Sequence, residues 1–180
     1  MGYMIAHKYT KKLFKIDENI GMTIAGIVGD AQLLVRYLTA EVELYKLKRN
    51  TQITVKGAST LLANILSGAR FFPYFVGLIL GGVDKEGPHV YSLDLIGGSI
   101  EDKYVSVGSG SPFVYGILED YYKDDITVNE GIDIALRGLT ASMKRDAASG
   151  DGYSVATITE KEFREYTDDE IKKRTSKLKL

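Results

Sequence analysis

Apolar residues recur along the chain with two periods, one typical of strands and one of helices. Residues 11–16 alternate charged and apolar side chains, and residues 20–29 are almost wholly apolar after a turn at residues 17–19. This pattern predicts a β-hairpin whose second strand is buried on both faces. Further strands are predicted at residues 74–84, 89–97, 103–110 and 153–159.

A long helix is predicted to follow Asp30, which we expect to cap it. Its apolar residues recur at steps of four and three, so they form one stripe that we expect to face the core. The predicted stripe consists of Leu33, Tyr37, Ala40, Leu44 and Leu47.

The starts of four later helices are marked by capping residues. A serine followed by proline is typical of a helix start, and T-x-x-E is the pattern of a capping box. The predicted starts are Thr54, for a helix that ends near Pro73, Ser111-Pro112, Thr127 with Glu130, and Thr167 with Glu170.

The order of these elements favours an α+β fold. Strands come in antiparallel groups and helices in pairs, unlike the strict alternation of a doubly wound sheet. We see no linker, repeat or low-complexity tract, so residues 1–180 are predicted to form a single domain in which helix layers lie outside packed sheets.

Composition excludes several classes of function. The net charge of −1 argues against a broad nucleic-acid surface or an acidic-membrane surface. The chain has no cysteine and only two histidines, so a thiolate metal site, a multi-histidine metal site and a cysteine nucleophile are excluded. No apolar run is long enough to span a bilayer and no signal peptide is recognisable, so a cytoplasmic protein is the default expectation.

Three polar stretches interrupt the apolar pattern, and each has a structural and a functional interpretation. Lys12 is either a solvent-facing strand residue or a lysine that lowers the pKa of a nucleophile. Residues 107–113 form either a tight turn or a helix N-terminus that holds an anion, but they lack a P-loop pattern. In residues 145–152, Asp146 and Ser149 lie three residues apart at a helix end, which is either a simple helix stop or part of a site.

Together these stretches resemble a known family. The segments TKKLFKID, GMTIAGIVGDAQ, GSGSPFVYG and RDAASGDG, in this order and at these spacings, are similar to the β-type subunit of the archaeal proteasome core particle. The resemblance runs from about Ala6 to near the C-terminus. The related bacterial two-component protease is a poorer match, because it lacks the GSGSPF form.

The resemblance implies an N-terminal-nucleophile hydrolase with a four-layer αββα sandwich. Such subunits use the hydroxyl of a threonine at the mature N-terminus, with its own α-amine or a water as the proton relay. By this match Lys12 is the catalytic lysine. Ser109, Asp146 and Ser149 match the residues that form the hydrogen-bond network around the nucleophile.

The same match implies a set of substrate-binding residues. Gly26 corresponds to the glycine whose backbone N–H serves as an oxyanion donor. Thr10, Ile24 and Val28 correspond to positions that line the pocket for the residue before the cut, and Gln32 lies at its edge. The two aliphatic side chains favour large hydrophobic substrate residues.

One departure from the family concerns the nucleophile. The family's threonine lies well upstream of the lysine, but here only eleven residues precede Lys12, and their one threonine, Thr10, matches a pocket position. We therefore expect the chain of 1–180 to lack the N-terminal segment that carries the nucleophile and the first β-hairpin. Such a chain is predicted to be inactive and to expose an unpaired sheet that favours aggregation.

The leading hypothesis is that the complete protein is a threonine endopeptidase subunit without a cofactor. The resemblance implies proteasome α subunits and other β subunits as partners in stacked heptameric rings, an ATPase regulator, and unfolded polypeptides as substrates. A non-catalytic structural β subunit that completes the ring is the alternative, and an anion-binding module is a third hypothesis.

Overall fold

Two compact units make up the part of the chain that the structure describes. The computed structural model describes residues 10–150 and 152–180, so the basic residues His7 and Lys8 lie outside the described residues. We call residues 12–107 and 158–164 the sheet unit. Among the described residues, the helical unit consists of residues 10–11, 108–150, 152–157 and 165–180.

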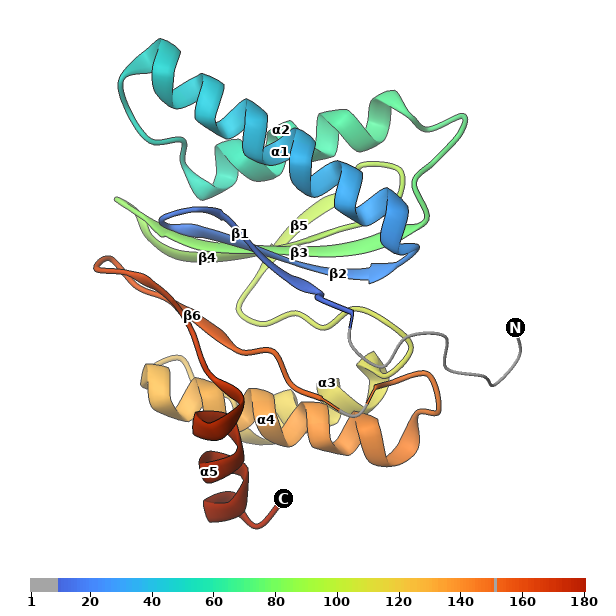
Figure 1. The fold of residues 1–180 in the computed structure, drawn as a ribbon, viewed down its shortest axis with the longest axis vertical. Coiled ribbons are helices and arrows are strands. Elements are labelled where there is room, and N and C mark those ends of the chain that lie inside the picture. Colours follow the sequence, from blue (N-terminus) through green and yellow to red (C-terminus); the bar gives the residue numbers. More distant parts are fainter. Residues whose placement is uncertain (1–9, 151) are drawn as a thin grey trace. The chain divides into compact units, whose positions relative to one another are not determined.

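The sheet unit is built on a five-stranded antiparallel sheet with its strands in sequence order (Figure 1). The hairpin predicted near the start of the chain is confirmed, because β1 pairs with β2 across a short turn. Within β2, Ile20, Met22 and Ile24 face the core, whereas Thr23 and Ala25 on the other face are only partly buried, so the predicted burial on both faces is not complete. The strands are β1 (Leu13–Asp17), β2 (Ile20–Gly26), β3 (Val76–Asp84), β4 (Gly87–Leu93) and β5 (Ser99–Asp102).

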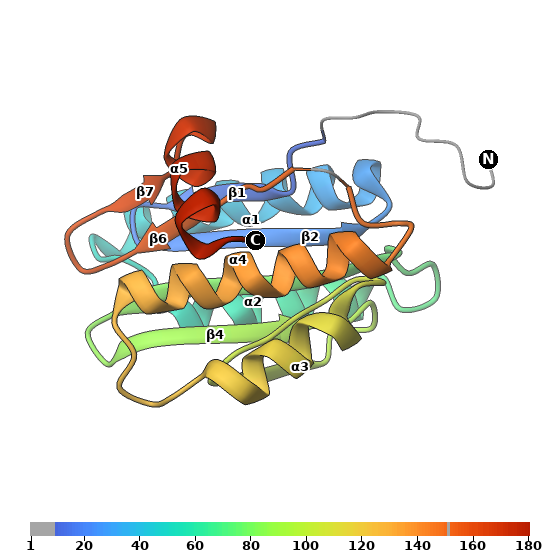
Figure 2. The same cartoon turned by 90° about the horizontal axis from the view of Figure 1, so that it is seen from below.

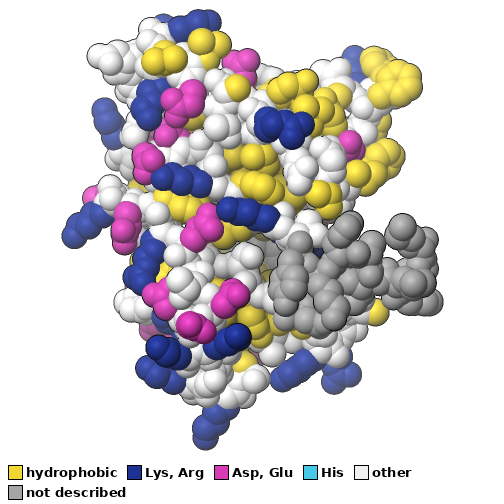
Figure 3. Space-filling model, in the orientation of Figure 1, with side chains coloured by type: hydrophobic (Ala, Val, Ile, Leu, Met, Phe, Trp, Pro, Cys, Tyr) yellow, Lys and Arg dark blue, Asp and Glu magenta, His cyan; other side chains and the backbone are white. Residues whose placement is uncertain are grey.

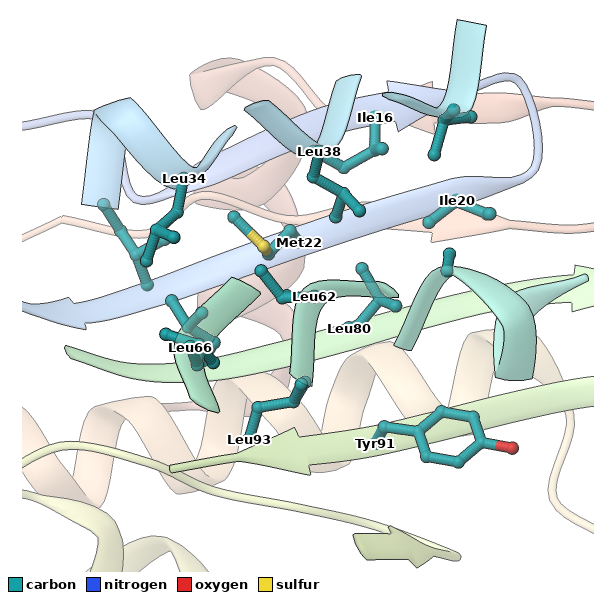
Figure 4. Close-up of a cluster of buried hydrophobic side chains, with 14 of the residues drawn as sticks. Ile16, Ile20, Met22, Leu34, Leu38, Leu62, Leu66, Leu80, Tyr91 and Leu93 are labelled. Atoms are coloured by element: carbon teal, nitrogen blue, oxygen red, sulfur yellow. The ribbon is translucent and has the colours of Figure 1, made fainter. Parts of the chain in front are cut away.

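Helices α1 (Val28–Arg49) and α2 (Val55–Gly68) cover one face of this sheet. Side chains from both helices meet those of β2, β3 and β4 in a continuous apolar core (Figure 4). The predicted start of this helix at Thr54 is confirmed, and the structure shows that Thr54 is its N-cap, since its side chain accepts a hydrogen bond from Gly57 N at 3.0 Å. Fully buried core residues include Ile20, Met22, Leu34, Leu38, Leu62, Leu66 and Leu80.

The predicted apolar stripe of α1 is wrong. Tyr37, Leu44 and Leu47 are exposed, and Leu47 is 79% exposed. The helix is apolar on more than one side, so its periodicity alone cannot select the face that packs against the sheet. The buried row is Ala31, Leu34, Leu38 and Val42.

Two further local predictions are wrong. Asp30 does not cap α1, because the N-cap is Ile27, and the Asp30 carboxylate instead accepts a hydrogen bond from Phe75 N at 3.0 Å. The strand predicted at residues 103–110 is absent from the described structure, and the fifth strand is β5, just before that segment. The Asp30 carboxylate is bound by a backbone N–H 45 residues away, whereas β5, directly before residues 103–110, is the segment that pairs with β4.

The helical unit contains α3 (Ser111–Tyr121), α4 (Val128–Arg145) and α5 (Asp168–Leu178). Helices α3 and α4 lie side by side (Figure 2). Both predicted capping boxes are confirmed: Thr127 with Glu130 begins α4, and Thr167 with Glu170 begins α5. A small apolar cluster joins α4 to α5, formed by Ile132, Leu136, Val155 and Ile171.

A short hairpin of β6 (Ala156–Ile158) and β7 (Phe163–Glu165) follows α4. The strand predicted at 153–159 is therefore shorter than expected, and β7 was not predicted. Within residues 10–150 and 152–180 these two strands alone make up the second sheet. Helices and antiparallel strands in this order confirm the α+β class.

Candidate active site

Ser109 lies in the loop that leads into α3. Gly108 has a φ of +103°, which glycine adopts readily, and Ser111 N donates to its carbonyl oxygen at 3.1 Å. Gly110 is the N-cap of α3 and Pro112 lies in its first turn, so the prediction of Ser111 as the cap is wrong by one residue. This turn places Ser109 immediately before the helix.

Asp146 lies at the C-terminal end of α4 and organises the turn that follows. Its backbone N–H donates to Ser142 O at 2.8 Å and closes the last helical turn. Its side chain accepts from Ala148 N at 3.2 Å, and its carbonyl oxygen accepts from Ser149 N at 3.1 Å. An aspartate that bonds to the backbone two residues later stabilises such a turn, which brings Ser149 back over Asp146.

Two serine hydroxyls share one oxygen of this aspartate. Ser109 Oγ and Ser149 Oγ each donate to Asp146 Oδ2 at 2.7 Å, and Ser142 Oγ lies 2.7 Å from Ser149 Oγ. The hydrogen bond from Ser109, then that from Ser149 and the backbone N–H of Ala148, lower the pKa of Asp146. The carboxylate is therefore ionised at neutral pH. We call Ser109, Ser142, Asp146 and Ser149 the serine–aspartate cluster.

In the serine–aspartate cluster, the hydroxyl oxygens of Ser109 and Ser149 lie next to the negatively charged Asp146 carboxylate. Because the protons of Ser109 and Ser149 point at the carboxylate, the remaining lone pairs of these oxygens can accept a hydrogen bond from an ammonium or hydroxyl group. The same carboxylate disfavours the anion-binding interpretation of the Ser109 loop, since it would repel a second anion. In the described part of the chain, no group of histidines, aspartates and glutamates could hold a metal ion.

The structure brings together three of the four predicted catalytic residues and adds one that the sequence did not reveal. Ser109 is 37 residues from Asp146 in sequence, yet the two are hydrogen-bonded. Ser142 was missed by sequence reasoning. Its position one helical turn before Asp146 is the pattern that could have identified it.

Lys12 belongs to the sheet unit, just before β1. Its carbonyl oxygen accepts a hydrogen bond from Ile24 N at 3.0 Å, and its side chain is exposed. Thr10 is half-buried and belongs to the helical unit. The catalytic role of Lys12 and the substrate-binding role of Thr10 stay predictions.

The other predicted substrate-binding residues lie where β2 passes into α1. Gly26 is exposed with a φ of +106°, and a Cβ there would lie 2.2 Å from Phe75 O, so the backbone conformation requires glycine. Val28 is 38% exposed and its side chain is available for contact. Ile24 is only 6% exposed and belongs to the core, which leaves little of its side chain for a substrate.

A second cluster of titratable groups lies in the sheet unit. His89 Nδ1 is 2.6 Å from Glu101 Oε1 and its Nε2 is 3.4 Å from Asp84 Oδ1, while Tyr91 donates to Glu101 Oε2 at 2.8 Å. The bond to Glu101 raises the pKa of His89, and burial together with Glu101 raises the pKa of Tyr91 to about 12. Asp84 also accepts from Val55 N at 2.8 Å. This cluster therefore joins β3, β4 and β5 to the start of α2.

Comparison with known proteins gives a consistent family assignment. The Proteasome family model, described as a proteasome subunit, matches residues 1–158. The proteasome subunit beta of Methanothermobacter thermautotrophicus is 52% identical over 179 residues, which cover 99% of this chain and 85% of the relative. That of Thermoplasma acidophilum is 50% identical over 181 residues, which cover 100% of this chain and 85% of the relative.

The proteasome subunit beta of Methanosarcina mazei gives the same picture, with 50% identity over 179 residues, 99% of this chain and 85% of the relative. In the described residues, no helix is long and apolar enough to cross a membrane. Identity at this level along almost the whole chain supports a common fold as well as a common origin. The chain belongs to the proteasome subunit family.

Proposed function

We propose that the protein is a β subunit of the proteasome core particle and acts as a threonine endopeptidase that degrades unfolded proteins in a closed chamber. The observation that carries this proposal is the serine–aspartate cluster, in which two hydroxyls donate to one ionised carboxylate oxygen at 2.7 Å. A subunit that only completed a ring would not need this arrangement. The names of the relatives, each a proteasome subunit beta, support the proposal.

The proposed nucleophile is a threonine at the mature N-terminus, as in the family that the chain resembles. Its hydroxyl attacks the substrate carbonyl while its α-amine, with a pKa near ~8, accepts the proton at neutral pH. In this proposal Ser109, Asp146 and Ser149 orient the amine, because an ionised carboxylate with bound hydroxyls stabilises a developing ammonium.

The remaining proposed roles belong to Thr10, to Lys12 before β1, and to residues where β2 passes into α1. Lys12 supplies positive charge near the nucleophile and favours its ionised form. The backbone N–H of Gly26 donates to the oxyanion, and Thr10 and Val28 line the pocket for the residue before the cut, while Ile24, which is buried in the core, contributes little of its side chain. The exposed side chain of Val28 is consistent with an apolar pocket.

An exposed apolar patch on the sheet unit supports assembly with other subunits. Figure 3 shows hydrophobic side chains on the right of the view, where Figure 1 has the start of α1 and the loop between α2 and β3. Patches of this kind mark interaction surfaces. The proposed partners are α and β subunits in stacked heptameric rings and an ATPase regulator, all in the cytoplasm. The exposed residues are Ile27, Val28, Phe71, Phe72 and Phe75.

The test compares two chains co-assembled with proteasome α subunits. One chain is residues 1–180, and the other adds the segment encoded upstream in the same reading frame. We expect only the longer chain to cleave a hydrophobic fluorogenic peptide, and a threonine-directed inhibitor to abolish the cleavage. Lys12→Ala in the longer chain serves as the catalytically impaired control.

Two outcomes would contradict the proposal. An in-frame stop codon immediately upstream, without a threonine-bearing segment, would exclude the proposed nucleophile. Assembled particles of the longer chain that never cleave the peptide would favour the non-catalytic structural subunit.

A further inference from the structure

Ser142 is a buried hydroxyl that the proposed function does not use. It lies on α4, is 5% exposed, and stands one helical turn before Asp146. Its Oγ is 2.7 Å from Ser149 Oγ, so it contacts the network without touching the carboxylate. A buried hydroxyl needs a hydrogen-bond partner, and Ser149 supplies one.

The donor in each hydrogen bond of this network can be assigned by counting protons. A carboxylate only accepts, and each serine has one hydroxyl proton. Because the protons of Ser109 and Ser149 are both directed to Asp146 Oδ2, the Ser142 hydroxyl must donate to Ser149 Oγ. The network therefore runs in one direction from Ser142 through Ser149 to Asp146.

Gly110 shows how closely the Ser109 loop packs on this pair. A Cβ at Gly110 would lie 1.8 Å from Ser142 Oγ and 2.9 Å from Ser149 Oγ. Gly110 is buried and has a φ of −81°, so its need for glycine arises from the two serine hydroxyls and not from its backbone conformation. The residue after Ser109 is thus in direct contact with Ser142.

We propose that Ser142 is a positioning residue for the proposed reaction, whose hydroxyl holds the Ser149 proton on Asp146 and leaves the outer lone pair of Ser149 to accept a hydrogen bond from the nucleophile's amine. This inference deepens the proposed function and rests on it. Without Ser142, a second lone pair of Ser149 Oγ is left open, so the amine no longer meets this hydroxyl from one fixed direction. The effect falls on the chemical step, since Ser142 itself touches no substrate.

The kinetic test uses the longer chain assembled with α subunits. Ser142→Ala is expected to lower kcat about five-fold with KM unchanged, whereas Ser142→Thr, which keeps the hydroxyl, retains at least about half of kcat. Thr140→Val is the matched control. It also removes a buried hydroxyl from α4, but that hydroxyl bonds to Leu136 O and Tyr153 and not to the cluster. We expect it to leave kcat unchanged.

A double-variant comparison tests whether Ser142 acts through Ser149. The kcat of the double variant, Ser142→Ala with Ser149→Ala, is expected to equal that of Ser149→Ala alone. The denaturant midpoints of the unsubstituted protein, the two single variants and the double variant are also compared. The midpoint change of the double variant should differ from the sum of the two single changes, and this measurement does not depend on peptidase activity. If the unsubstituted particle is inactive, the proposed function fails while the midpoints still decide the Ser142–Ser149 coupling. Additive midpoints, or an unchanged kcat in Ser142→Ala, would overturn the inference.

Discussion

Replacing Gly26 by alanine tests the link between the end of β2 and the start of β3. The added Cβ would lie 2.2 Å from Phe75 O and 3.1 Å from Val76 Cα, which are backbone atoms and cannot rotate away. Phe75 O also accepts the hydrogen bond from Ile27 N at 2.9 Å, so any shift of this oxygen weakens that contact. The φ of +106° adds backbone strain for any residue with a side chain.

The expected loss of stability follows from these two effects. Holding alanine in a strained conformation costs about 1–3 kcal/mol, and forcing packed segments apart costs about another 1–3 kcal/mol. Since 1 kcal/mol shifts Tm by about 2–4 °C in a chain of this size, we expect Gly26→Ala to lower Tm by roughly 5–20 °C. Thermal unfolding followed by circular dichroism measures this shift, on the free chain or on its complex with α subunits.

Gly29→Ala is the matched control. Gly29 lies three residues later in the first turn of α1, and a Cβ there would meet nothing within 4 Å. Alanine is favoured over glycine in a helix by up to about 1 kcal/mol, so this variant should be as stable as the parent or slightly more stable. A Tm for Gly26→Ala within about 2 °C of that for Gly29→Ala would refute the reasoning.

Four other predictions follow from the structure. Asp146→Asn in the longer, assembled chain should reduce kcat about 100-fold or more, because it removes the charge that both hydroxyls bind; near-normal peptide cleavage would contradict this. His89→Gln should destabilise the protein more at pH 6 than at pH 9 in urea unfolding. The folded-state pKa of His89 is raised, so its contribution is complete below the unfolded pKa of about 6.5 and is lost as the pH rises through the folded value; a pH-independent difference would argue against this. Thr127→Ala should cost about 1 kcal/mol of unfolding free energy by removing the capping box, while Thr60→Ala, at an exposed site within α2, should cost less. Phe72→Ser should leave Tm unchanged but reduce ring assembly in size-exclusion chromatography, since Phe72 is 91% exposed; normal assembly would place the interface elsewhere.

Several features were predictable because they depend on short-range interactions. The capping boxes at Thr127 and Thr167 each involve residues three positions apart, so their geometry follows from the local chain. The hairpin of β1 and β2 has the same origin, since two apolar segments are separated by a tight turn. The close approach of Asp146 and Ser149 also follows from their spacing at a helix end.

Other features depend on packing between distant segments. Asp30 was expected to cap α1, but the backbone of Phe75 competes for its carboxylate. Residues 103–110 have the composition of a strand, but the edge strand of the sheet next to β4 is β5. A sequence pattern alone does not show that Phe75, 45 residues from Asp30, lies within hydrogen-bond distance of it, nor which of two adjacent segments pairs with β4.

The sequence by itself therefore determined the α+β class, most of the helix starts and the resemblance from which Ser109, Asp146 and Ser149 are predicted to be site residues. The tertiary structure alone decided which side of α1 is buried, because both apolar rows of that helix satisfy the same periodicity and only contact with the sheet distinguishes them. It also decided that Ser109 and Ser149 donate to the same oxygen of Asp146, and that Ser142 joins them. The 2.7 Å hydrogen bond between Ser109 and Asp146, which are 37 residues apart, exists only once the loop before α3 has packed against the end of α4.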